Sequence, residues 1–259
     1  MTQSAGKSRK VASREEWLEA RKDLLVKEKQ LTRQSDALAI ERRHLPWVKV
    51  DKQYVFDTPK GKKTLSDLFD GRSQLIVYHF MFGPEWKEGC HGCSMISDHI
   101  GGSTQHLANR DVTLLAVSRA PLSKIDEFKK RMDWRFRWVS SFGSDFNRDY
   151  HVSFSEEDLA KGDVEYNFTK QTSWRRDEAP GASVFYKNEK GEVFHTYSTY
   201  GRGNEQFMGV YRYLDLVPKG RDEDGLPNPS AWVKHHDRYE QDYYADAKAE
   251  QQTKVAGGR

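Results

Sequence analysis

Apolar residues in this chain gather in short runs that are typical of strands buried in a sheet. Two runs, residues 74–82 and 112–118, are almost continuously apolar, as in strands covered on both faces. Between them, the pattern predicts a helix over residues 93–107. After the second run Pro121 opens another helix, in which apolar residues recur three or four positions apart.

The second half of the chain predicts a third strand, a hairpin and a last helix. These are residues 136–140, the strands 183–186 and 193–198 joined by a glycine-bearing turn, and residues 204–214. Minor elements are a strand at 54–56, a turn and brief helix at 61–70, a short helix or turn at 145–152, and an inserted loop at 156–178. The order predicts an α/β, thioredoxin-like fold, with a mixed central sheet flanked by helices.

A long helix is predicted over residues 14–43, ahead of this domain. Ser13 and Glu16 form a capping-box pattern at its start, and Pro46 ends the segment. Four apolar residues recur every seven positions: Trp17, Leu24, Leu31 and Leu38. The complementary heptad positions are polar, so we do not expect a coiled coil. We expect this stripe to pack on the helix's own domain, and a homodimer contact is the alternative.

The composition predicts five segments. They are a disordered lead (1–12), an N-terminal helical extension (13–46), the thioredoxin-like domain (47–217), a C-terminal extension (218–245) and a disordered tail (246–259).

Charge and hydropathy narrow the class of protein. Charged residues make up 31% of the 259 residues but leave a net charge of only +3, which does not indicate nucleic-acid or membrane binding. No apolar run approaches the ~20 residues that cross a bilayer, and residues 1–10 are polar and basic without an apolar region behind them. We therefore expect a soluble, cytoplasmic protein, in which cysteines are more often catalytic than structural.

Both cysteines, Cys90 and Cys93, lie between a predicted strand and a predicted helix start. The unpaired amides of a helix N-terminus stabilise a thiolate and lower its pKa. Two intervening residues let a second sulfur reach back to a mixed disulfide. The spacing therefore predicts dithiol chemistry, with Cys90 attacking and Cys93 resolving. His91 adds positive charge beside Cys90, and Gly92 permits a tight turn.

Other interpretations remain open. A zinc site normally takes four ligands, and a mixed site could be completed by His79, His91, His99 and His195. A metal- or heme-binding module is therefore one alternative. A non-catalytic interaction protein, using the N-terminal helix and the aromatic tail, is another.

Long stretches of the chain resemble one family. They are residues 65–75 (LSDLFDGRSQL), 79–82 (HFMF), 117–121 (VSRAP), 138–141 (WVSS) and 194–203 (FHTYSTYGRG), with Trp17, Cys90, Cys93 and Ser94. Over roughly residues 13–240 the chain resembles the thioredoxin superfamily and, more closely, the domain of unknown function 899, described as predicted dithiol-disulfide oxidoreductases. The resemblance implies a dithiol-disulfide oxidoreductase. From the dithiol at the predicted helix start we expect a substrate bearing a disulfide or sulfenic acid, an external thiol reductant and no bound organic cofactor.

The chain departs from thioredoxins and peroxiredoxins at the dithiol. Gly89 takes the place of the tryptophan that precedes the first cysteine in thioredoxins, and Trp86 lies four positions before Cys90. Lys87 takes the place of the Thr or Ser of typical peroxiredoxins, which argues against fast peroxide reduction.

Four further residues are candidates for supporting the site. By position, Pro180 matches the cis-proline that thioredoxin folds place beside the dithiol. His79, at the end of the strand before the loop, is a candidate base. His195 on the hairpin could face the site, and Arg202 could bind an anionic group of the substrate.

Overall fold

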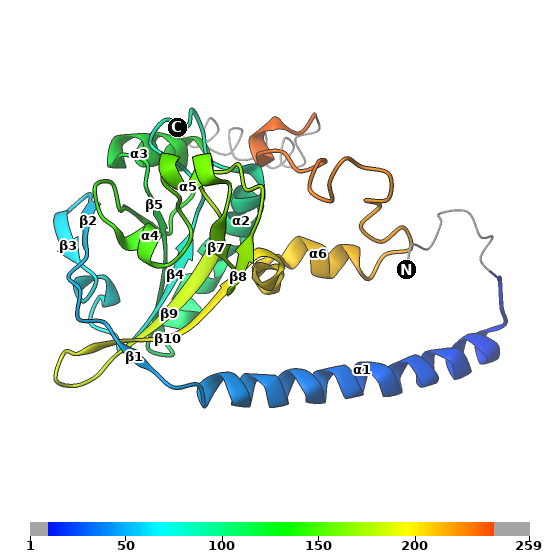
Figure 1. The fold of residues 1–259 in the computed structure, drawn as a ribbon. Coiled ribbons are helices and arrows are strands. Elements are labelled where there is room, and N and C mark those ends of the chain that lie inside the picture. Colours follow the sequence, from blue (N-terminus) through cyan, green and yellow to red (C-terminus); the bar gives the residue numbers. More distant parts are fainter. Residues whose placement is uncertain (1–9, 241–259) are drawn as a thin grey trace, which may run out of the picture.

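The computed structural model describes residues 10–240 and shows a sheet domain with a long helix beneath it (Figure 1). The predictions of disorder for residues 1–9 and for the tail from 246 onward lie outside the described residues.

Six α-helices and three short 3₁₀ helices occur within residues 10–240. They are α1 (Arg14–Arg43), η1 (Asp67–Phe69), α2 (His91–Ala108), α3 (Leu122–Arg131), α4 (Phe146–Asp149), α5 (Glu156–Lys161), η2 (Gly201–Phe207), α6 (Gly209–Leu214) and η3 (His236–Arg238). The strands of the same region are β1 (Val48–Lys49), β2 (Val55–Thr58), β3 (Gly61–Thr64), β4 (Gln74–His79), β5 (Val112–Ser118), β6 (Arg137–Ser140), β7 (Val164–Tyr166), β8 (Thr169–Gln171), β9 (Gly181–Lys187) and β10 (Val193–Tyr200).

The described residues form one eight-stranded mixed sheet in the order β1-β10-β9-β4-β5-β6-β2-β3. β4, β5 and β6 are parallel, while β9 pairs antiparallel with β4 and with β10. Val77 therefore lies between Leu115 and Ser183 at the centre of the sheet. The β4-α2-β5-α3-β6 unit followed by the β9–β10 hairpin confirms the predicted thioredoxin-like fold.

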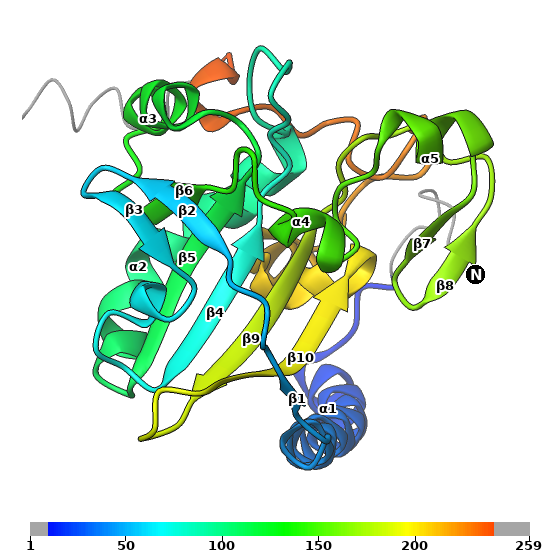
Figure 2. The ribbon, with the colours of Figure 1, turned by 60° about the vertical axis from the view of Figure 1, so that its left-hand side comes forward.

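Figure 2 shows β5, β4, β9 and β10 side by side in this sheet. The sheet carries a hydrophobic core on each face. Side chains alternate along a strand, so Tyr78 and Phe80 lie in the core beneath α2 and α3, whereas Leu75 and Val77 lie in the core beneath η1 and α4. His79 shares the face of Val77, because it lies two residues further along β4. The sheet therefore lies between the His79 side chain and α2.

Several boundaries differ from the predicted ones. The strand predicted over 74–82 ends at His79. The segment predicted as an inserted loop over 156–178 contains α5 and the β7–β8 hairpin, and the turn before η1 contains β3. The predicted last helix is divided, because Met208 has a non-helical φ of −94° and ψ of 85° between η2 and α6. Single-chain periodicity misses such elements because they are only three to six residues long.

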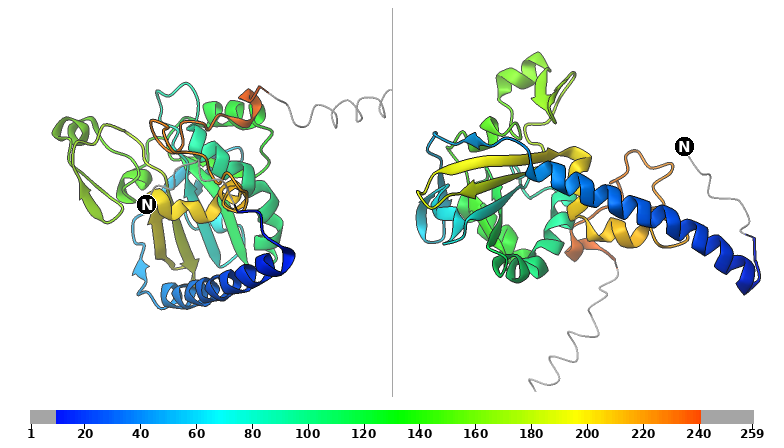
Figure 3. Two further views of the ribbon diagram at one scale, coloured as in Figure 1. Left: turned by 90° about the vertical axis from the view of Figure 1, so that its right-hand side faces the viewer. Right: turned by 90° about the horizontal axis from the view of Figure 1, so that it is seen from below.

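α1 begins with the predicted capping box, in which Ser13 Oγ accepts from the Glu16 amide and the Glu16 carboxylate accepts from the Ser13 amide. The expected packing of its apolar stripe is absent, since no residue of α1 is buried within the described chain. Trp17 is 55% exposed and Leu31 64%. Figure 3 shows α1 running past the edge of the domain. The homodimer contact stays a prediction.

In the part of the chain from 10 to 240, none of the helices combines the length and the apolarity that a bilayer crossing requires.

Candidate functional site

Cys90 is the N-cap residue of α2. Its backbone is extended (φ −61°, ψ 134°), and the helix begins at His91. The Cys90 carbonyl accepts the first intrahelical bond, from the Ser94 amide at 2.9 Å. Cys90 is partly exposed, whereas Cys93 is buried one turn into the helix; both are free thiols. The predicted helix start at Cys93 therefore moves to His91, which places Cys90 at the helix N-terminus.

The two cysteines have opposite electrostatic environments. A hydrogen bond from the Cys93 thiol, together with the amides of Cys93 and Gly92 and the charge of Arg176, lowers the pKa of Cys90 to about 6, although burial opposes the shift. Burial raises the pKa of the Cys93 thiol well above its ordinary value. These shifts favour the thiolate at Cys90 and the thiol at Cys93, and the roles of attacking and resolving cysteine stay a prediction.

Cys93 has partners on β4 and in the loop that follows it. The Met81 amide donates to Cys93 Sγ at 3.4 Å. The Tyr78 hydroxyl also lies beside this sulfur, and burial raises the pKa of Tyr78 well above its ordinary value, so the hydroxyl stays protonated. The Met81 amide therefore supplies the hydrogen-bond donor that holds the buried sulfur.

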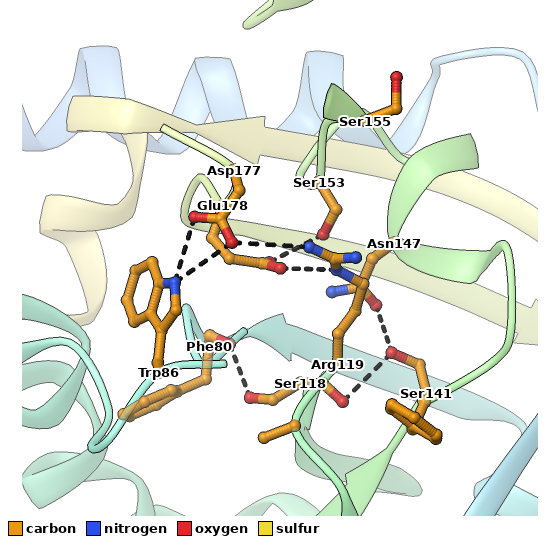
Figure 4. A network of polar contacts seen from close by, with 12 residues as sticks. Phe80, Trp86, Ser118, Arg119, Ser141, Asn147, Ser153, Ser155, Asp177 and Glu178 are labelled. Atoms are coloured by element: carbon orange, nitrogen blue, oxygen red, sulfur yellow. Dashed lines mark hydrogen bonds and ion pairs between the residues drawn. The ribbon is translucent and has the colours of Figure 1, made fainter. Parts of the chain in front are cut away.

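A polar network joins the loop before Cys90 to the segment before β9 (Figure 4). The Trp86 indole N–H lies 3.1 and 3.2 Å from the two carboxylate oxygens of Asp177. Next to it, the buried Glu178 accepts from Arg119 Nε at 2.6 Å and from Ser153 Oγ at 2.8 Å. Burial nevertheless raises the pKa of Glu178 to about 7, outweighing the attraction of Arg119. The network therefore ties together two loops that border the dithiol.

The structure brings only part of the predicted site set to the dithiol. Trp86 packs against the core that contains Cys93, and His91 is the residue after Cys90. Pro180 directly precedes β9, and its carbonyl accepts from the Tyr166 hydroxyl at 2.7 Å. The peptide bond before Pro180 is trans, since residues 10–240 contain no cis peptide bond. Arg202 is ion-paired with Glu205 at 2.7 Å and its side chain is exposed, so its role toward a substrate stays a prediction.

His79 and His195 lie on the opposite face of the sheet from α2. His79 Nε2 is hydrogen-bonded to Ser183 Oγ, Ser183 to Ser198, and Ser198 to His195 Nε2, each at 2.8 Å. The ring of His79 lies 6.0 Å from that of Tyr150 in the second core, and burial lowers the pKa of His79 to about 3. The structure therefore places His79 as a neutral buried residue and His195 as a half-buried one, both away from the dithiol.

The histidines of the metal alternative do not gather around the cysteines. His79 and His195 are on the other face, and His99 Nε2 accepts from the Val210 amide at 3.3 Å. One group of potential ligands within residues 10–240 is Glu88, His91 and His235, whose ligand atoms lie within 4.8 Å of one another.

The surroundings of this group do not suit a cation. The Glu88 carboxylate is ion-paired with Arg131 and Arg238, both at 2.8 Å. Two guanidinium groups therefore occupy its oxygens, and their charge opposes a metal ion.

Sequence reasoning missed four residues around the dithiol: Tyr78, Arg176, Glu178 and His235. Tyr78 was visible only as part of an apolar run, and Arg176 and Glu178 as part of a polar insert. His235 belongs to the aromatic stretch of the C-terminal extension, which the pattern does not connect to residue 90.

Comparison with known families identifies the chain. Residues 6–239 match the family described as "Bacterial protein of unknown function (DUF899)". The chain belongs to the DUF899 family. A search of curated protein sequences finds no match.

Solved structures similar to this DUF899 protein share little sequence with it. A mutant of PrxQ from Xylella fastidiosa is 12% identical, covering 66% of this chain and 97% of its own, with a TM-score of 0.41. StoA from Bacillus subtilis is 15% identical, covering 62% and 96%, with a TM-score of 0.37. A putative thiol:disulfide interchange protein DsbE from Chlorobium tepidum is 13% identical, covering 64% and 97%, with a TM-score of 0.38. Likenesses this weak do not bear on the activity of the chain.

Proposed function

We propose that this DUF899 protein is a thiol-disulfide oxidoreductase in which Cys90 attacks and Cys93 resolves. The observation that carries the proposal is the placement of a partly exposed cysteine at the N-cap of α2 and a buried cysteine one turn further along the same helix. The neighbouring Cys93 thiol and the first amides of the helix lower the pKa of Cys90 to about 6. A purely structural pair of buried cysteines would not require one cysteine with a lowered pKa and partial exposure beside one with a raised pKa.

The reaction takes two exchange steps. The Cys90 thiolate attacks one sulfur of a substrate disulfide, forming a mixed disulfide and releasing the other sulfur as a thiolate. Cys93 then gives up its proton and attacks Cys90 Sγ, which releases the second substrate thiol and leaves a Cys90–Cys93 disulfide. The substrate gains two electrons from the dithiol, and an external thiol reductant returns them. With a sulfenic acid as substrate, water is the first leaving group.

The surrounding residues support these steps. The Met81 N–H holds Cys93 in place until the mixed disulfide forms, and the Tyr78 hydroxyl lies beside its sulfur. The charge of Arg176 favours the Cys90 thiolate. Since Lys87 stands where peroxiredoxins carry Thr or Ser, a disulfide or sulfenic acid is a better substrate than a peroxide.

The test is turnover of a disulfide substrate with a thiol reductant in excess. We expect Cys90→Ser to abolish turnover, since its hydroxyl is not ionised at neutral pH. We expect Cys93→Ser to stop after the first step with substrate attached to Cys90, which mass spectrometry detects. Undiminished turnover in Cys90→Ser would refute the proposal, and the exposed Ser103→Ala on α2 serves as the control.

A further inference from the structure

The C-terminal extension returns across the loop that carries the dithiol. We call residues 233–238 the C-terminal strap. Val233 is buried against the residues of α2 and α6. Beyond it, both carboxylate oxygens of Asp237 accept from Arg131, at 2.8 and 2.9 Å, and Arg238 is ion-paired with Glu88. The strap is thus anchored on both sides of His235.

The side chain of His235 is completely buried between this strap and the loop. Its Nδ1 lies 3.1 Å from Arg131 Nη2, and its Nε2 lies 2.9 Å from the Gly89 carbonyl oxygen. A guanidinium can only donate, so Nδ1 must be the unprotonated nitrogen. Nε2 therefore carries the proton and donates it to Gly89. Burial lowers the pKa of His235, in keeping with this neutral form.

The hydrogen bond to Gly89 fixes one half of a particular peptide group, the one that joins Gly89 to Cys90. The other half is fixed as well, because the Cys90 amide donates to the Met81 carbonyl at 3.1 Å. A planar peptide held at both its oxygen and its N–H cannot rotate. Its orientation sets the direction in which Cys90 leaves the loop and enters α2.

The packing around Gly89 further restricts the backbone of the loop. A Cβ at this position would lie 2.6 Å from the ring of Phe80, so the backbone already touches the core on that side. Phe128 supports both partners: its ring centroid is 6.3 Å from that of Phe80 and 5.2 Å from that of His235. Gly89 is therefore clamped between Phe80 and His235.

We propose that His235 is a positioning residue for Cys90, holding the Gly89–Cys90 peptide so that the sulfur stays at the N-terminus of α2. The proposal rests on the function proposed above. Without this hydrogen bond the peptide turns and Cys90 Sγ moves away from the amides of Gly92 and Cys93. The Cys90 thiolate then loses its stabilisation. The C-terminal strap, although remote in sequence, is therefore part of the redox site.

Full-length variants test this role through the ionisation of Cys90. His235→Gln keeps an N–H donor at the end of a flexible chain, and His235→Met has the same length without a donor. His236→Leu is the matched control. His236 is the neighbour of His235, but its ring is hydrogen-bonded to Asp98 on α2 and not to the loop. The rate of alkylation by iodoacetamide is followed from pH 4.5 to 9, together with disulfide turnover.

We expect His235→Met to raise the alkylation midpoint by about one pH unit and to lower turnover at pH 6 several-fold. His235→Gln and His236→Leu should keep midpoints near that of the wild type. A wild-type midpoint in a folded His235→Met protein, or an equal rise in His236→Leu, would overturn the proposal. If His235→Met does not fold, His235→Phe replaces it in the comparison with His235→Gln, since it keeps a ring beside Phe128.

The wild type separates this inference from the proposed function. A midpoint near the ordinary 9.0 and no turnover in the wild type would mean that the function itself is wrong. A low midpoint with normal turnover, unaffected by His235→Met, would remove only the role of His235.

Discussion

Replacing Cys93 by alanine removes the largest single influence on the reactivity of Cys90. The pKa of Cys90 falls from an ordinary 9.0 to about 6, which corresponds to about 4 kcal/mol in favour of the thiolate. The Cys93 thiol shares this effect with two backbone amides and with Arg176. In Cys93→Ala the amides and the arginine remain, so we expect the pKa to rise by about one pH unit, or about 1.4 kcal/mol.

The assay is a stopped-flow reaction with a small chromogenic disulfide between pH 4.5 and 9. The wild type should show a rate midpoint near pH 6, and Cys93→Ala a midpoint near pH 7. The plateau rate at high pH should change in the other direction. A thiolate of higher pKa is the better nucleophile, with a Brønsted slope of about 0.4–0.5, so the plateau of Cys93→Ala should be about threefold higher.

Cys93→Ser is the matched control, because its hydroxyl remains a hydrogen-bond donor at the same position. Its midpoint should lie between those of the wild type and Cys93→Ala. The reasoning is refuted if Cys93→Ala keeps the wild-type midpoint, since the hydrogen bond between the two side chains would then not govern Cys90. A lower plateau in Cys93→Ala would also contradict it.

Two pH-dependent predictions concern buried groups near the sheet. The folded-state pKa of His79, about 3, lies below the ordinary 6.5, so its contribution to stability is present above pH 6.5 and is lost as the pH falls. Between pH 7 and pH 4, the free energy of unfolding measured in urea should fall by about 3 kcal/mol less in His79→Phe than in the wild type. An equal fall in both proteins would contradict this. The folded-state pKa of Glu178, about 7, lies above the ordinary 4.5, so its contribution is present below pH 4.5 and is lost as the pH rises through 7. The difference in the free energy of unfolding between Glu178→Gln and the wild type should therefore shift by up to about 3 kcal/mol in favour of the variant from pH 4 to pH 8. A shift in favour of the wild type over this range would contradict the prediction.

Much of the fold could be predicted because it depends on local pattern. The apolar runs of β4 and β5 identify strands covered on both faces, and the connection between them is long enough for a helix, which makes the pair parallel. The capping box at Ser13 marks the start of α1 to the residue. The failures were also local in origin: β3, β7 and β8 are three or four residues long, too short for a period to show.

The partners of the candidate site could not be predicted, because the contacts that create them join distant parts of the chain. Tyr78 and Val77 are consecutive residues of an apolar run and point to opposite faces of the sheet. Tyr78 has the Cys93 thiol as a neighbour only because α2 packs on its face. The same choice of face removes His79 from the site. Which face a helix covers is decided by chirality and by the remaining core, not by the residues of the strand alone.

The amino-acid sequence by itself determined that two cysteines stand at a strand-to-helix junction with spacing for exchange, because strand, turn and helix tendencies act over a few neighbouring residues. Tertiary structure alone decided the rest of the site. It divided the acidities of Cys90 and Cys93 by burying one sulfur and leaving the other at the helix end. It also brought His235 across 146 residues of chain to the Gly89 carbonyl, since burial and hydrogen bonding depend on distance in space.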